Sequence, residues 1–141
     1  MTSEQRLHIK GMNVFKKITI ETKPHKEILN NQVGDYQENE NEIIITVADI
    51  GNKKLSFLIA IHELVELFMI NDSDITIKQV EDWDAMYEYQ RKDGDFSEAG
   101  DHPKCPYRRF HFAATNVERI VADLLNVSWS DYENKINSLE Y

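Results

Sequence analysis

The most apolar stretch of this chain, residues 55–70 (LSFLIAIHELVELFMI), carries three ionisable side chains near its middle. Its content of leucine, isoleucine, phenylalanine and alanine predicts a buried helix. Burying an unpaired carboxylate or imidazolium among such residues costs several kcal/mol. His62, Glu63 and Glu66 therefore need partners that the rest of the fold brings to them.

The spacing of these residues predicts a metal site. On a helix, His62 and Glu66 are four residues apart and project from one face, with Cβ atoms roughly 5–6 Å apart. A divalent metal would satisfy both, and Glu63 would lie beside it without binding it. This HExxE pattern is a relative of HExxH, in which two helix residues hold zinc and the glutamate is the general base. The alternative is that both glutamates face solvent or pair with Arg or Lys side chains elsewhere.

A metal site of this kind needs a third ligand, and His111 is the preferred candidate. It lies near the start of a helix predicted over residues 107–126. If that helix packs across residues 55–70, His111 completes a His/Glu/His set with one position open for water. An open position distinguishes catalytic from structural zinc. The alternative for His111 is a hydrogen-bonded histidine at a helix end.

Three further residues are candidates for the same site. His102, in the irregular stretch AGDHPKCPY, competes with His111 as a loop ligand, although loop histidines are more often solvated. Glu118 shares a helix face with His111, as a fourth ligand, an acceptor for an imidazole N–H, or an ordinary surface glutamate. Tyr107 could donate to a developing oxyanion, with packing in the core as its alternative.

The first half of the chain reads as strands. Alternating Ile and Thr predict a strand within residues 13–22, and EIIITVAD predicts another over residues 42–49. The stretch around residues 33–37 is expected to pair with the latter as a hairpin. A short helix is possible over residues 23–31, after Pro24.

The second half reads as helices. Helical spacing of apolar residues predicts three main helices, over residues 55–70, 77–91 and 107–126, and a last short helix ending near Leu139. Glycines and prolines exclude one regular element over residues 92–106, and a loop of that length is often functional. The expected fold is α+β: a single domain over residues 1–141, with a small N-terminal antiparallel sheet followed by three main helices.

Charge and cysteine content restrict the partners. The net charge of −9, from 16 basic and 25 acidic residues, argues against a nucleic-acid binder, which needs a basic face. Cys105 is the only cysteine, so the chain forms no internal disulfide and no cysteine-based zinc cluster. The N-terminal residues lack the apolar core of a signal peptide, and residues 55–70 are short for a membrane span. We expect a cytoplasmic protein that binds neither nucleic acid nor membrane.

Several motifs together resemble a family of uncharacterised proteins encoded by bacteriophages and prophages. The resemblance covers most of residues 34–133. It departs from the family at Asn126 and Ser128, where the family more often has Gly and Asp, a difference expected to affect a turn. The motifs that carry it are Gly34-Asp35-Tyr36, IIITVADIGN, HELVE, Trp83-Asp84, GDHPKCPY, the helix from His111 to Glu118, and LLNVSWSDYE.

A phage protein with a buried HExxE helix is also similar to small zincin-like metallopeptidases, which implies a zincin-like fold. That similarity covers chiefly residues 62–66. It departs from the zincin pattern at Glu66, which stands where those enzymes have a second histidine. A carboxylate there lowers the charge of the site and favours manganese or iron as alternatives to zinc. It is also compatible with loss of the peptidase chemistry.

These observations lead to two functional hypotheses. The first is metal-assisted hydrolysis of an amide bond in a peptide or protein substrate, with zinc, manganese or iron held by His62, Glu66 and His111 and with Glu63 as general base. The second is a phage-encoded, non-enzymatic binding protein that acts on a host factor, with a structural metal or an ion-pair network. Phosphoester hydrolysis is disfavoured because no basic cluster surrounds the motif.

Overall fold

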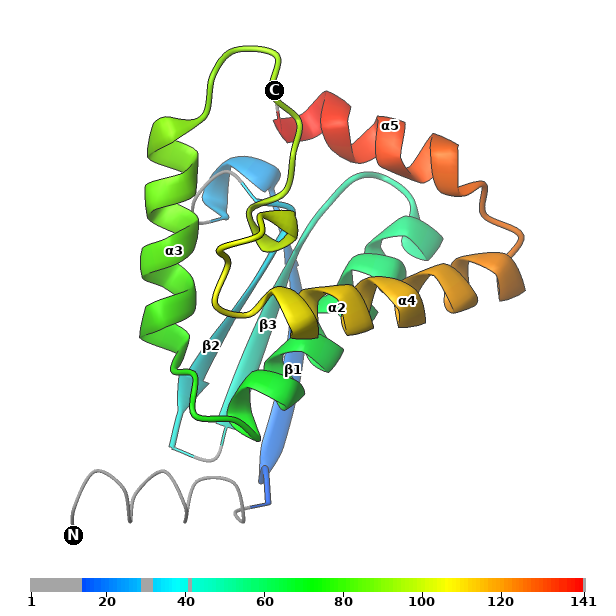
Figure 1. The fold of residues 1–141 in the computed structure, drawn as a ribbon. Coiled ribbons are helices and arrows are strands. Elements are labelled where there is room, and N and C mark those ends of the chain that lie inside the picture. The colour runs from blue at the N-terminus through cyan, green and yellow to red at the C-terminus, as the bar shows by residue number, and fades with distance from the viewer. Residues whose placement is uncertain (1–13, 29–31, 41, 141) are drawn as a thin grey trace, which may run out of the picture.

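The computed structural model describes residues 14–28, 32–40 and 42–140 and has an α+β fold (Figure 1). Residue 13 and residues 29–31, parts of the predicted first strand and short helix, lie outside the described residues. A small sheet is followed by helices, as expected. The elements in chain order are β1 (Lys17–Lys23), the 3-10 turn η1 (His25–Glu27), β2 (Gly34–Asn39), β3 (Glu42–Ala48), α2 (Lys53–Asn71), α3 (Ile77–Gln90), the 3-10 turn η3 (Ala99–Asp101), α4 (Arg108–Leu124) and α5 (Trp129–Glu140).

The sheet is mixed, which corrects the expectation of a wholly antiparallel one. The predicted hairpin is present: β2 and β3 pair antiparallel, with Tyr36 opposite Ile45. β1 pairs parallel to β3, with Ile18 opposite Ile43, and the strand order is β1-β3-β2. A sequence pattern can predict that two strands pair when a tight turn joins them. It does not reveal that β1 lies on the edge of β3 opposite β2, nor that β1 runs parallel to β3.

Helix α2 lies between the sheet and α4, and so occupies the centre of the fold (Figure 1). The inward face of β3 contributes Ile43, Ile45 and Val47 to the core. The α2 residues that pack there are buried as predicted, but the helix is not buried all round. Phe57 and Phe68 are about half exposed. The fully buried α2 side chains are Leu58, Ile59, Leu67 and Ile70.

Local features of the chain explain where α2 and α3 begin and where α4 ends. The Asn52 side chain accepts from the backbone N–H groups of the first turn of α2. Thr76 and Gln79 form a reciprocal capping box at the start of α3. Asn126 follows α4 with a φ of 56°, a left-handed conformation that glycine and asparagine adopt most readily. Asn126 therefore occupies a turn position that asparagine tolerates.

The segment between α3 and α4 is irregular, as predicted, but it is packed. The indole N–H of Trp83 donates to the carbonyl of Ala99, and Arg91 donates to the carbonyls of Asp95 and Ser97. Cys105 is buried at the end of this segment, and burial raises the pKa of its thiol to about 11.

Within the described residues, none of the helices combines the length and apolar character needed to cross a membrane.

Candidate metal centre

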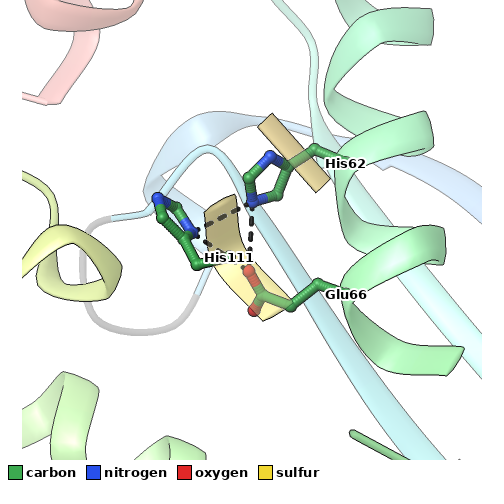
Figure 2. A group of neighbouring side chains, drawn as sticks. All are labelled: His62, Glu66 and His111. Atoms are coloured by element: carbon green, nitrogen blue, oxygen red, sulfur yellow. Dashed lines mark hydrogen bonds and ion pairs between the residues drawn. The ribbon is translucent and has the colours of Figure 1, made fainter. Parts of the chain in front are cut away.

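His62, Glu66 and His111 converge on one point between α2 and α4. Figure 2 shows His62 and Glu66 one turn apart on α2, with the ring of His111 facing them. Nε2 of His62 and Nδ1 of His111 each lie 3.1 Å from Oε2 of Glu66, and the two nitrogens are 3.2 Å apart. The helix pairing expected from the sequence therefore brings these three side chains together.

The spacing of these atoms fits a small metal ion. The three atoms form a triangle with sides of 3.1, 3.1 and 3.2 Å. A point about 2.0–2.1 Å from each atom, the usual distance from zinc to imidazole nitrogen or carboxylate oxygen, lies about 1 Å out of the plane of this triangle. Two imidazoles and one carboxylate form a donor set that suits zinc, manganese or iron.

The outer nitrogen of His62 is held by a carboxylate. Nδ1 of His62 donates to Oε1 of Glu118 at 3.0 Å, and the hydroxyl of Tyr132 donates to Oε2 of the same glutamate. Glu118 is buried on α4 and Tyr132 on α5. A carboxylate on the second ring nitrogen fixes the tautomer and orientation of a metal-binding histidine. Of the alternatives for Glu118, the geometry favours an acceptor for an imidazole N–H.

His111 is held in the same way from the other side. Its Nε2 donates to Oε2 of Glu98 at 2.7 Å and lies 3.3 Å from Oδ1 of Asp101. Gly100 lies against the ring, and a Cβ atom added there would collide with it. The segment that precedes α4 therefore supplies two carboxylates and the space that the His111 ring occupies.

The protonation of this cluster favours a cation. In each histidine we call the ring nitrogen that faces Glu66 the inner nitrogen and the other the outer nitrogen. A neutral imidazole that donates through its outer nitrogen has a lone pair on its inner nitrogen. The two inner nitrogens and the Glu66 oxygen would then direct lone pairs at one another across about 3.1–3.2 Å. Protonating one ring leaves a lone pair facing that oxygen, and protonating both brings two N–H groups within 3.2 Å of each other. A metal ion bound to all three atoms removes each conflict.

The surrounding charges point in the same direction. Burial lowers the pKa of both histidines, but the carboxylates around them outweigh this effect and raise it above the usual range. Burial raises the pKa of Glu66, but hydrogen bonds from His111 and His62 outweigh burial and lower it to about 2. Glu66 is therefore ionised at neutral pH. Carboxyl groups outnumber the two imidazoles here, and a site with such an excess of acidic groups attracts cations.

Glu63 lies beside the cluster without belonging to it. It lines the same cavity and packs against Gly34, where an added Cβ would lie 2.7 Å from its Cγ and Oε1. Burial, and then the charge of Glu66, raise the pKa of Glu63 well above its usual range. This position, next to the predicted metal ligands and outside their set, is the one expected for Glu63.

Two further tyrosines donate to acidic groups, one to Glu66 in the cluster and one to Asp84 beside it. The hydroxyl of Tyr36 donates to Oε1 of Glu66 at 3.0 Å, so that Oε2 faces the two histidines. The hydroxyl of Tyr107 donates to Asp84, whose pKa burial raises to about 7. Tyr107 is buried and its proton is engaged, so the geometry favours core packing over the oxyanion role considered for it.

A cavity of about 90 Å³ adjoins the cluster. This volume is enough for a metal ion and a few water molecules. Its lining residues come from β2, from the segment before α4 and from each of the helices α2, α3, α4 and α5. Those that matter here are His62, Glu63, Glu66, Glu98, Gly100, Tyr107, His111, Glu118 and Tyr132.

His102 does not join the cluster. Its Nδ1 accepts from the backbone N–H of Lys104, and its ring packs near Trp83 and Tyr87. Of the two histidines considered as third ligand, only His111 reaches His62 and Glu66. His102 therefore stabilises the segment before α4 and lies outside the candidate centre.

Sequence reasoning missed four groups that hold the cluster: Tyr36, Glu98, Asp101 and Tyr132. Glu98 and Asp101 lie in an irregular segment whose path has no periodic pattern. Tyr36 and Tyr132 look like ordinary core tyrosines, and their hydroxyls become informative only when their acceptors are known. The single available signal was the number of acidic residues in the stretch before His111.

Comparison with protein-family models, with curated proteins and with solved structures found no match to this chain. The geometry of the site is therefore the basis for any functional conclusion.

Proposed function

We propose that the chain is a cytoplasmic, metal-dependent hydrolase that cleaves an amide bond in a peptide or protein substrate. One observation carries the proposal. The inner atoms of His62, Glu66 and His111 converge at 3.1–3.2 Å, while the outer nitrogen of each histidine is occupied by a carboxylate. This arrangement is typical of metal ligands with their supporting groups.

Each residue around the centre has a role in this proposal. His62, Glu66 and His111 bind the metal, which would polarise the scissile carbonyl and lower the pKa of a water molecule. Glu63 takes the proton of that water and passes it to the leaving amine. Glu118 and Glu98 keep both imidazoles oriented. The cavity next to the three ligands leaves room for water and for a substrate carbonyl.

The similarity to zincin-like metallopeptidases supports the same chemistry through the HExxE helix. Glu66 in place of the second histidine makes the donor set harder, so manganese and iron remain alternatives to zinc. The zincin-like fold stays a prediction.

The proposal is tested by metal content and by one matched variant. Tag-free protein is expected to hold about one equivalent of zinc, manganese or iron, and a protein with His62→Ala and Glu66→Ala is expected to hold none. Glu63→Gln is expected to retain the metal and to lose at least about 100-fold in peptide hydrolysis, because the amide cannot accept the proton. Full activity in Glu63→Gln would exclude the general-base role.

The second candidate is a binding protein in which the cluster is structural. The exposed apolar residues Ile120 and Leu124, one turn apart on α4, favour a docking face. Absence of metal from the purified protein, together with no uptake when metals are supplied, would leave a buried ion-pair network and favour this candidate.

A further inference from the structure

A groove of about 340 Å³ runs beside the candidate metal centre, between α4, α5 and the segment before α4. We call it the acidic groove. It shares Glu98, Glu118, Tyr132 and Ile136 with the cavity at the cluster. A chain that occupies the groove would therefore lie next to the metal ligands. The groove residues used below are Phe96, Glu98, Asp101, Phe112, Trp129 and Glu133.

The groove is negatively charged. Among the described residues, four carboxylates and a single guanidinium, that of Arg119, line it. The Arg119 guanidinium stacks on the Trp129 ring, with Cζ 4.6 Å from the ring centroid. The side chains of Glu98 and Asp101 are 51% and 50% exposed, so they can accept a second partner besides His111. Within the described part of the chain, the exposed Glu133 side chain has no ion-pair partner.

The groove also has an apolar side. Phe96 and Phe112 line it and remain 45% and 39% exposed, and the Arg108 guanidinium stacks on one face of the Phe112 ring, with Cζ 4.4 Å from the ring centroid. The indole N–H of Trp129 is buried without an acceptor among the described residues. A buried donor without a partner is destabilising. The groove thus combines aromatic surface with an excess of carboxylates.

We propose that the acidic groove binds the substrate chain and selects a basic side chain next to a large apolar one. The ammonium or guanidinium of the substrate would pair with Glu98, Asp101 and Glu133, and the apolar side chain would pack on Phe96 and Phe112. This inference rests on the proposed function, since the groove matters through its position beside the metal ligands. An acidic substrate would meet four carboxylates and be excluded.

Binding tests this proposal without turnover. Fluorescent peptides that differ only in a Lys-Phe or Glu-Phe pair are titrated into metal-loaded Glu63→Gln protein. The Lys-Phe peptide is expected to bind at least about 10-fold more tightly, and the preference is expected to shrink as salt is raised. Equal affinity for the two peptides would overturn the proposal.

Charge-reversal variants test whether the acidic groove causes the preference for the Lys-Phe peptide. Glu133→Lys, in the groove, is expected to weaken binding of the Lys-Phe peptide about 10-fold. Asp123→Lys is the matched control, because it makes the same change of charge at an exposed position on α4 outside the groove. It is expected to change affinity less than twofold. Equal losses in the two variants would assign the preference to net charge and overturn the groove assignment.

Phe112→Ala provides a second test that does not depend on charge. It is expected to remove most of the difference in affinity between a Lys-Phe and a Lys-Ala peptide, and an unchanged difference would contradict the apolar contact. Failure of the groove and failure of the proposed function are distinguishable. Metal-dependent hydrolysis that needs Glu63 but ignores peptide charge overturns the groove alone, whereas charge-selective binding without hydrolysis overturns the enzyme.

Discussion

Two glycines control the geometry of the candidate centre at the scale of single residues. Gly100 leaves the space that the His111 ring occupies, and Gly34 leaves the space that the Glu63 side chain occupies. Neither glycine has the positive φ that would explain its presence by backbone conformation. Each is therefore explained by the close approach of a site side chain.

The two glycines make a matched pair for mutation. Gly100→Ala is expected to displace His111 and weaken metal binding by at least about 10-fold, because a third ligand moves out of reach. Gly34→Ala is expected to keep the metal and lose hydrolysis, because the methyl group meets Glu63, which is not a ligand. Metal affinity measured by chelator competition and peptide hydrolysis separate the two effects. Retention of full metal affinity in Gly100→Ala would contradict this account of the site.

At the scale of elements, α5 is joined to the site by a hydrogen bond from Tyr132. Tyr132 is 1% exposed, whereas most other residues of this helix are partly or fully exposed. Its hydroxyl donates to Glu118, which in turn accepts from His62. The orientation of His62 on α2 therefore depends on a helix that follows it by more than fifty residues in sequence.

Removing that hydroxyl tests the dependence. Tyr132→Phe is expected to leave the fold intact and to weaken metal affinity about 10-fold, because Glu118 loses a donor and His62 is held less firmly. Tyr89→Phe, at a fully exposed position on α3, is the control and is expected to change nothing. An unchanged metal affinity in Tyr132→Phe would show that α5 does not support the centre.

Most elements could be predicted from sequence, because their signals are local. The HExxE helix, the helix with His111 and the β2–β3 hairpin follow from periodicity and turns. The parallel pairing of β1 and the carboxylates on His111 depend on which distant segments meet. Glu98 illustrates the limit, since it contacts His111 across an irregular segment. His111 itself was predicted because it lies on a helix expected to cross the first.

At the scale of the whole molecule, ionisation of buried acidic groups lowers the free energy of unfolding. Burial, and then the charge of Glu66, raise the pKa of Asp84 to about 7, although the hydrogen bond from Tyr107 opposes them. Between pH 4 and 7 the folded state keeps a proton on Asp84 that the unfolded state has released. The free energy of unfolding of the metal-free protein therefore falls as pH rises through this range, and the contribution of Asp84 is constant above it.

Asp84→Asn is expected to remove this contribution. The variant should match the wild type near pH 4 and be more stable at pH 8, by an amount on the order of 2–4 kcal/mol, since one pKa unit corresponds to about 1.4 kcal/mol. The amide oxygen still accepts from Tyr107. Urea unfolding of chelator-treated protein at both pH values measures the difference. Equal pH dependence in the two proteins would contradict the assignment to Asp84.

The single cysteine, Cys105, is buried, so its rate of chemical labelling can measure local opening of the structure. With its thiol covered and its pKa raised, Cys105 stays silent toward alkylating reagents while the segment before α4 is packed. Opening of that segment exposes the thiol to the alkylating reagent. Because the chain has one cysteine, all labelling occurs at Cys105. The rate of labelling at Cys105 thus measures how often the segment before α4, which contacts His111, opens.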